Sequence, residues 1–392
     1  MPDQTTRRLV VAFNFPPFTD GSAVTVAKRI IEADVPVDVF SADLSSVRAR
    51  DESLWDLVSP WIRDHQTVKV PILFADERSL VPFVTAGETA IRKRGTSYDE
   101  VYSRSMWPHS HFLAARLRTA GHADRWIAEF SDPILWHVDG TPRPSGTTSL
   151  KGSNLRLLRA VDHRSQTFLR NNATVLAWAQ FIPFLLADQL VFTNEQQLTV
   201  MLSDAPEWMR AGVEKKAVIA PHPTLGSEHY RDESEPTATP SSSRYSIGYF
   251  GTFYPNRGGG EFLEAISLLP AEMRERLELH VFTADAGTLL DVAARLNISD
   301  CVHRRPPLPF RDFLRVSGRY DALLVNDIAT SPFGVPSPFL PSKYSDYAGS
   351  SAATMAITLP SSPLDNKPAR WRAHVGDVDG IARMLASAIT VG

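Results

Sequence analysis

Apolar runs alternate with amphipathic stretches along the first half of the chain. An apolar run at residues 9–13 is followed by the turn-prone segment NFPPFTDGS and by VTVAKRIIEA, whose apolar positions recur at helical spacing. The same order of strand, loop and helix returns in VDVFSA, in DEVYSRS with HFLAARLRTA, in RWIAEFS, and in QLVFTN with EQQLTVML. Such repeated units predict a parallel sheet with helices on both faces.

Two long helical candidates follow within this half. They are SNLRLLRAVDHRSQTFLR and ATVLAWAQFIPFLLA, and the second is expected to bend or break at Pro183, because a proline inside a helix removes a hydrogen bond and clashes with the preceding turn. Both candidates fit an outer layer of helices.

The pattern stops at residues 226–244 and then restarts. GSEHYRDESEPTATPSSSR lacks apolar periodicity and is rich in Ser, Thr, Pro and Glu, a composition that buries too little surface to order itself. After it come YSIGYFGTF, EFLEAISLL, LELHVFTA, TLLDVAARL, FRDFLRV, DALLVND, PSKYSDYAG and ATMAITL, again alternating between strand and helix patterns. The segment is therefore interpreted as a linker between two α/β domains.

These patterns predict two Rossmann-like domains with parallel sheets. The first spans 1–225, the linker spans 226–245, and the second domain spans 246–370. The remaining residues, 371–392, contain the amphipathic VDGIARMLASAI, a helix for which we expect packing back on the first domain. Ligands of open α/β sheets bind at the carboxyl ends of the strands, so the cleft between the domains is the expected site.

Composition narrows the class of partner. The chain of 392 residues has 43% hydrophobic and 22% charged residues and a formal charge of −3, so it should fold and has no global field that favours nucleic acid. The single cysteine, Cys301, cannot form an internal disulfide, and no spacing of Cys with His indicates zinc. No signal peptide or run of about 18 apolar residues occurs, so we expect a cytoplasmic protein, with peripheral membrane contact left open.

The clearest local motif is YFGTFYPNRGGGEFLEAI at 249–266, where a strand leads through a glycine-rich loop into a helix. Glycines let the backbone approach a ligand closely, and a helix N-terminus favours phosphate. Arg257 could pair with a diphosphate through two parallel hydrogen bonds. The alternative is a permissive turn that carries a solvated arginine.

A second motif is LPSKYSDYAGSSAATMAIT at 340–358. Pro341 and Ser342 suit a helix start, and Lys343 and Asp346 lie three residues apart on one helical face. A cation for phosphate and a carboxylate for ribose hydroxyls would then lie together. An exposed ion pair of little energetic value is the other interpretation.

PSKYSDYAGSSAATMAI and FGTFYPNR resemble segments of the retaining glycosyltransferases of family 4, which have the GT-B fold, and NFPPFTDGSA and VIAPHP resemble the N-terminal loop and the last strand before the linker of that family. The resemblance implies transfer of a sugar from a nucleotide-diphosphate donor, with retention of configuration and without a metal or another cofactor. The acceptor would be a glycan, a lipid-linked molecule or a small molecule. Residues implied at the donor are Gly251, Thr252, Arg257, Ser342, Lys343 and Asp346.

The chain departs from that family at the usual pair of glutamates. Asp346 stands at the later position and Pro338 at the earlier one, so the way in which the transferred sugar is held is open. Two alternatives follow, a nucleotide-sugar 2-epimerase on the same architecture and a catalytically silent relative that binds nucleotide or glycan.

Further candidates lie at strand ends of the first domain. Asp132, in WIAEFSDPI, is a candidate for catalytic or acceptor contact, although an Asx turn before Pro133 also suits it, and Glu129 in the strand is a candidate buried structural acid. The resemblance places Asp132, Arg257 and Lys343 at the reaction. The remaining candidates for substrate contact are Gly21, Ser22, Arg104, His109 and His222.

Overall fold

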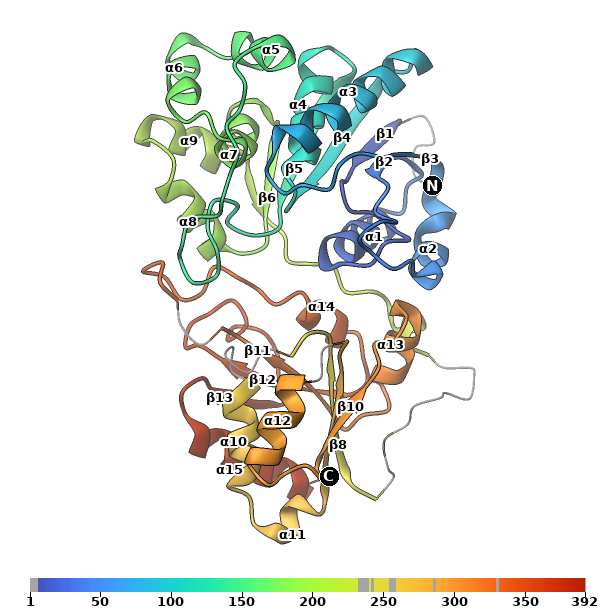
Figure 1. Cartoon of the computed structure of the whole chain (residues 1–392), viewed down its shortest axis with the longest axis vertical. Helices are drawn as coiled ribbons and strands as arrows, with labels where there is room; N and C mark the ends of the chain where they lie inside the picture. Colours follow the sequence, from blue (N-terminus) through green and yellow to red (C-terminus); the bar gives the residue numbers. More distant parts are fainter. Residues whose placement is uncertain are drawn as a thin grey trace. The chain divides into compact units, whose positions relative to one another are not determined.

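The chain forms two compact units, Met1–Pro223 and Thr224–Gly392, each with a parallel sheet of its own (Figure 1). The computed structural model describes residues 6–231, 240, 243–253, 259–284, 287–328 and 331–391. The division lies close to the predicted break after residue 225. No helix in these ranges is long and apolar enough to cross a membrane.

The first unit contains a sheet of seven parallel strands in the order β3-β2-β1-β4-β5-β6-β7. The strands are β1 (Arg8–Val11), β2 (Val37–Ala42), β3 (Ile62–Val68), β4 (Tyr98–Ser105), β5 (Ala123–Phe130), β6 (Gln189–Phe192) and β7 (Ala217–Ile219). Strand order reverses between β1 and β4, and ligands of such sheets bind outside the carboxyl ends at this switch point.

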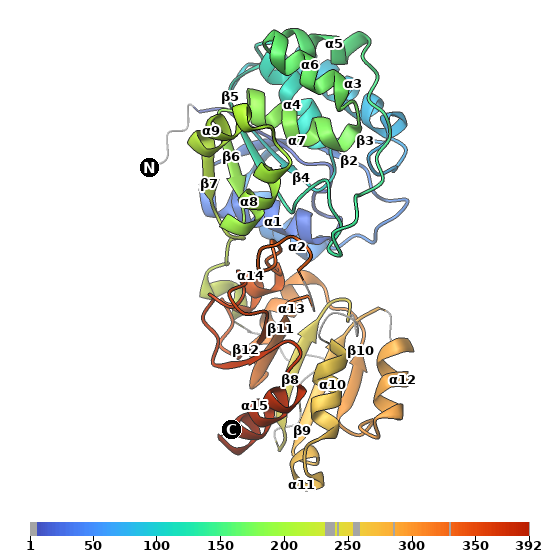
Figure 2. The same ribbon diagram turned by 90° about the vertical axis from the view of Figure 1, so that its left-hand side faces the viewer.

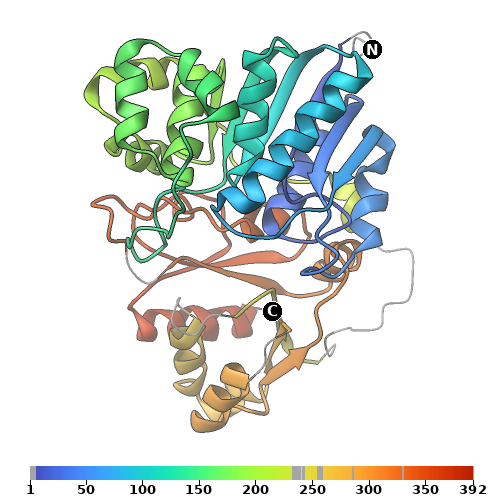
Figure 3. The same cartoon turned by 45° about the horizontal axis from the view of Figure 1, so that its top comes forward.

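Helices connect the strands of the first sheet. They are α1 (Gly21–Ala33), α2 (Glu52–Val58), η1 (Ser59–Trp61), α3 (Glu77–Arg94), α4 (His109–Thr119), α5 (Gly152–Arg159), α6 (His163–Asn171), α7 (Val175–Leu186), α8 (Glu195–Ser203) and α9 (Glu207–Lys216). Asp20 caps α1 by accepting a hydrogen bond from the amide of Ala23 at 2.8 Å. Helices α3 and α4 lie side by side (Figure 3).

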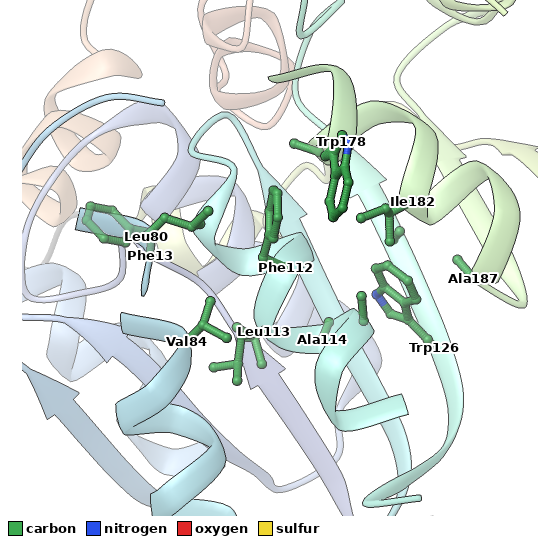
Figure 4. Close-up of a cluster of buried hydrophobic side chains, with 14 of the residues drawn as sticks. Phe13, Leu80, Val84, Phe112, Leu113, Ala114, Trp126, Trp178, Ile182 and Ala187 are labelled. Carbon is green, nitrogen blue, oxygen red and sulfur yellow. The ribbon is translucent and has the colours of Figure 1, made fainter. Parts of the chain in front are cut away.

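The core of the first unit lies between α3, α4 and α7 and the strands (Figure 4). Trp126 of β5 and Trp178 of α7 are fully buried, and the ring of Trp178 stacks on Phe112 of α4 at 6.3 Å between centroids. Every residue of α7 from Val175 to Phe184 is buried, and the helix continues through Pro183 to Leu186 instead of ending at the proline. The sequence predicted a bend or a break at Pro183, and the structure shows that the helix does not break there.

The second unit repeats this topology with six parallel strands in the order β10-β9-β8-β11-β12-β13. The strands are β8 (Tyr245–Phe250), β9 (Leu277–Phe282), β10 (Val302–Arg305), β11 (Ala322–Asn326), β12 (Ala353–Thr358) and β13 (Trp371–His374). The switch point of this sheet lies between β8 and β11. The chain thus has the two parallel α/β sheets that the sequence predicted.

The remaining helices belong to the second unit. They are η2 (Ser227–Tyr230), α10 (Gly260–Ser267), α11 (Ala271–Arg274), α12 (Gly287–Arg295), α13 (Phe310–Ser317), α14 (Lys343–Tyr347) and α15 (Val378–Val391). The C-terminal helix α15 packs on α10 and β13, and Figure 2 shows it beside α10. Its buried face, which includes Ile381, Leu385 and Ile389, thus belongs to the core of the second unit.

The first residues of the predicted linker are part of the second unit. Tyr230 is buried, and its hydroxyl donates a hydrogen bond to the carbonyl oxygen of Asp346 at 2.7 Å. A Cβ atom on Gly349 would come within 2.4 Å of the Tyr230 ring, so the two residues are in close contact. The polar composition of 226–244 concealed this aromatic anchor.

Candidate functional site

A buried charged group occupies the carboxyl end of β4 and β5 in the first unit. Arg104 and Glu129 are partners in the sheet register, and Nε of Arg104 donates to Oε1 of Glu129 at 3.2 Å. The other carboxylate oxygen accepts hydrogen bonds from Nε of Arg29 at 3.0 Å and from the hydroxyl of Tyr102 at 2.9 Å. Glu129 is therefore the buried, hydrogen-bonded acid that the sequence suggested.

Arg104 also brings together three of the predicted substrate residues. Its Nη1 donates to Oγ of Ser22 at 2.7 Å, and its Nη2 lies 3.2 Å from Nε2 of His222. Ser22 follows Gly21 at the start of α1, and His222 follows β7. These residues therefore meet at the switch point between β1 and β4, the place where the topology favours a ligand.

The charges of this group are fixed by burial and by pairing. Burial lowers the pKa of His222 well below its usual value, and Arg104, Lys28 and Arg29 lower it further, so the imidazole is neutral at pH 7. Burial opposes the charge on Arg29, but Glu129 holds its pKa above the usual range. Two guanidinium groups thus surround one buried carboxylate, an arrangement that can stabilise negative charge on a substrate.

Asp132 follows β5 and lies half-buried near the same group. Burial raises the pKa of this carboxyl group, while the positive charges of Arg143 and Arg104 oppose that rise. Arg104 thus acts electrostatically on Asp132, which is a second candidate acidic residue at the carboxyl end of the sheet.

His109 lies in the core of the first unit. Its ring packs 4.0 Å from Phe13 and 5.6 Å from Phe83 between centroids, and it is fully buried. Its Nε2 lies 2.8 Å from Oγ of Ser79, and burial lowers its pKa to about 3. His109 therefore packs among aromatic rings at the start of α4, and its contact with a substrate stays a prediction.

Lys343 is the central residue at the switch point of the second sheet. It begins α14, and its Nζ lies 3.9 Å from the centroid of the Tyr249 ring on β8. Burial lowers the pKa of this lysine to about 7, although Asp346 favours the charged form. A desolvated ammonium group held over an aromatic face is suited to an anionic ligand that would compensate its charge.

Gly251 gives Lys343 the space that it occupies. The backbone of Gly251 has φ +111°, a region that side chains rarely adopt, and a Cβ atom there would lie 3.0 Å from Cε of Lys343. The backbone angle therefore favours glycine at this position, and the end of the Lys343 side chain fills the space that a Cβ atom would enter. The sequence motif predicted the glycine but not its contact with the lysine.

The other donor candidates surround this pair. The carbonyl oxygen of Thr252 accepts a hydrogen bond from the Tyr249 hydroxyl at 3.0 Å, and that of Ser342 accepts one from Oγ of Ser345 at 2.7 Å. Asp346 is buried, so it is not the exposed half of a surface ion pair. Arg257 lies outside the described residues.

Sequence analysis missed a buried acid at this edge. Asp327 follows β11, is 2% exposed, and accepts hydrogen bonds from the amide of Leu359 and the hydroxyl of Ser362. Burial raises its pKa to about 6. Its position directly after the apolar run DALLVN was the signal that could have indicated it.

Comparisons with known proteins fit this geometry. No family model and no curated protein matches the sequence. The structure is similar to a glycosyltransferase from Rickettsia africae, with 12% identity over 99% of this chain and 89% of that chain and a TM-score of 0.58. It is also similar to a sucrose-phosphate synthase from Thermosynechococcus elongatus, with 13% identity over 98% and 90% and a TM-score of 0.59.

A third similar structure is described as trehalose-6-phosphate from E. coli bound with UDP-2-fluoro glucose. It shares 12% identity over 98% of this chain and 92% of that chain, with a TM-score of 0.60. At these identities the likeness concerns the fold. The chain has the GT-B fold, two Rossmann-like parallel sheets, as the sequence predicted.

Proposed function

We propose that this chain is a glycosyltransferase that moves a sugar from a nucleotide-diphosphate donor to a glycan, lipid-linked or small-molecule acceptor. The observation that carries the proposal is Lys343, half-buried with its Nζ over the Tyr249 ring and its side chain beside Gly251, at the switch point of the second sheet. A cation so placed lacks the hydration that stabilises it in water, and a diphosphate would restore that stabilisation.

In this proposal the second unit binds the donor. Lys343 and the backbone around Gly251 face the diphosphate, and the buried Asp346 receives the ribose hydroxyls. Arg257 has the same role as Lys343 by its resemblance to the family 4 motif. As the bond from the anomeric carbon to the β-phosphate oxygen breaks, negative charge grows on that phosphate, and these positive groups stabilise it most in the transition state.

The first unit contributes the acceptor side. Asp132 contacts the acceptor or the reacting sugar, and the group formed by Ser22, Arg104 and His222 compensates negative charge on a substrate. The acceptor hydroxyl attacks the face that the phosphate leaves, the departing phosphate takes its proton, and the anomeric configuration is retained. No metal takes part in this scheme.

The similar structures support the class of reaction. One is described as a glycosyltransferase and another as bound with UDP-2-fluoro glucose, a nucleotide sugar. These relatives support a nucleotide-sugar donor for this chain, and the choice of nucleobase is left to experiment.

A thermal-shift panel of UDP, GDP, ADP, CMP, dTDP and their sugar conjugates tests the donor site. Ligands that bind the folded state raise its melting temperature, so one nucleobase should give a selective shift. Lys343→Ala and Arg257→Ala should each abolish that shift. Asp132→Asn should keep it and lose turnover with the donor that binds.

The outcomes are separable. An unchanged shift in both cation variants would refute the diphosphate site, and Asp132→Asn with full turnover would refute the role of Asp132. A selective shift without transfer to any acceptor would favour a silent binding partner, and interconversion of the donor sugar without an acceptor would favour an epimerase.

A further inference from the structure

Three potential metal ligands meet on the second sheet, away from the nucleotide site. Glu278 and His280 lie two residues apart on β9 and therefore point to the same face. His303 on β10 is the register partner of His280, and the two rings lie 5.2 Å apart between centroids. One ligand atom from each of the three side chains lies within 4.8 Å of the others.

Two of the three ligand atoms already have the spacing that a metal needs. Oε2 of Glu278 and Nε2 of His280 are 3.5 Å apart. Ligands about 2.1 Å from a tetrahedral zinc ion are about 3.4 Å from one another. His303 is half-buried on the edge strand of the sheet, so a side-chain adjustment of about 1 Å, by the same geometry, completes the set.

The surroundings of His280 fit a ligand whose second nitrogen is held in place. Its Nδ1 lies 2.9 Å from the hydroxyl of Tyr320, while Nε2 is buried and has no hydrogen-bond partner in the described part of the chain. Metal-bound histidines usually donate their other ring N–H to such a partner, which leaves the first nitrogen with a lone pair for the metal. Tyr320 is itself buried.

The charges at this cluster select the kind of ion. One carboxylate and two imidazoles suit zinc and neighbouring transition metals, whereas Mg²⁺ and Ca²⁺ need several oxygen ligands. Arg305, two residues after His303, adds a positive charge that acts on His280. This positive charge disfavours a metal ion that is bound by electrostatic attraction alone. It favours an ion that coordinates the lone pairs of the imidazole nitrogens.

We propose that Glu278, His280 and His303 form a divalent transition-metal site that joins β9 to the edge strand β10, with water in the remaining position. Zinc is the ion that these ligands fit best. The site is independent of the glycosyltransferase proposal, because its residues lie within the strands and not at the carboxyl ends where Gly251 and Lys343 meet.

Calorimetric titration of the metal-free full chain with Zn²⁺ tests this site. Wild type should bind one ion, and His280→Ala, His303→Ala and Glu278→Gln should each weaken binding by at least about 100-fold, with about 10-fold for Tyr320→Phe. His374→Ala removes an exposed histidine of the same sheet and serves as the matched control. Mg²⁺ should give no binding at the same concentration.

Cobalt provides a readout that a merely structural role would not change. Co²⁺ at the site should give visible absorption bands of a low-coordinate ion, lost in His303→Ala and kept in His374→Ala. The proposal is overturned if wild type does not bind the ion, or if the His303→Ala and Glu278→Gln variants bind it as tightly as wild type does. If His280→Ala does not fold, the His303→Ala and Glu278→Gln variants still test the metal site. Circular dichroism verifies that each variant is folded.

Discussion

At the scale of single residues, Lys343 connects burial with function. Desolvation lowers the pKa of Lys343 to about 7 because it disfavours the charged ammonium form. A bound anion would stabilise that charged form. Buried charges of this kind are a cost to the fold, and they cluster at functional sites for that reason.

Nucleotide affinity should depend on pH through Lys343. A bound diphosphate favours the ammonium form and raises its pKa above about 7, so binding takes up a proton. Affinity for the nucleotide that gives the largest thermal shift should therefore be highest near pH 7 and fall between pH 7 and 9, by up to about tenfold per unit. Titration calorimetry at several pH values measures this, and Lys343→Arg, whose charge persists, should flatten the profile. A flat wild-type profile contradicts the assignment.

Gly251→Ala should weaken nucleotide binding. The new methyl group meets Cε of Lys343 at 3.0 Å and also strains a backbone with φ +111°. Gly376→Ala is the control, because Gly376 has φ +85° but nothing within 4 Å of its added methyl group. Both variants should lose about 1 kcal/mol of stability, and only Gly251→Ala should lose affinity. Equal affinities in the two variants would show that the contact with Lys343 is unimportant.

At the scale of elements, a capping side chain and the packing of the core decide where helices begin and how far they continue. SNLRLLRAVDHRSQTFLR has the pattern of one helix, but the chain breaks it into α5 and α6, where Asp162 accepts a hydrogen bond from the amide of Ser165 and caps the second helix. Proline had the opposite outcome in α7, which continues through Pro183. Local propensity predicted these helices, whereas the Asp162 cap set the start of α6 and packing allowed α7 to continue past its proline.

Glu129→Gln should destabilise the first unit strongly. It removes the carboxylate that pairs with Arg29 and Arg104, and it leaves the buried Arg104 without a charged partner, at a cost of about 3 kcal/mol; the half-buried Arg29 keeps its ion pair with Glu32. Glu100→Gln, on β4, is the matched control, because its partners Arg8 and Arg125 are partly exposed and such pairs contribute less than about 1 kcal/mol. Urea unfolding at pH 7 measures both, and a similar loss in the two variants would refute the structural role of the buried group.

At the scale of the whole molecule, each of the two sheets packs in a hydrophobic core of its own. Each core is built from residues of one unit, and each sheet places its own switch point at its own set of candidate residues. The arrangement divides the proposed reaction between a donor unit, with Lys343, and an acceptor unit, with Arg104 and Asp132.

Calorimetric melting should therefore resolve two transitions. Leu190→Ala, in the first core, and Leu324→Ala, in the second, should each destabilise one unit by about 2–5 kcal/mol and so identify its transition. The nucleotide from the thermal-shift panel should raise the transition that Leu324→Ala lowers. A nucleotide effect on the transition that Leu190→Ala lowers would move the donor site to the first unit.

The sequence by itself determined the fold class and the residues near strand ends. Alternating strand and helix patterns are local, so they predicted both parallel sheets, and the PSK and glycine motifs pointed to Gly251 and Lys343 because backbone conformation and helix starts leave local marks. Cys301 is likewise buried and unpaired, as its isolation in the sequence indicated.

Only the tertiary structure decided which of these residues meet. Arg104 contacts Ser22 and His222, which are 82 and 118 positions away in the sequence. His109 is buried among aromatic rings, Tyr230 packs beside Gly349, and α15 packs on α10. These contacts depend on how side chains from distant segments pack together in one core. The local periodicity of the sequence does not predict which distant segments will be neighbours.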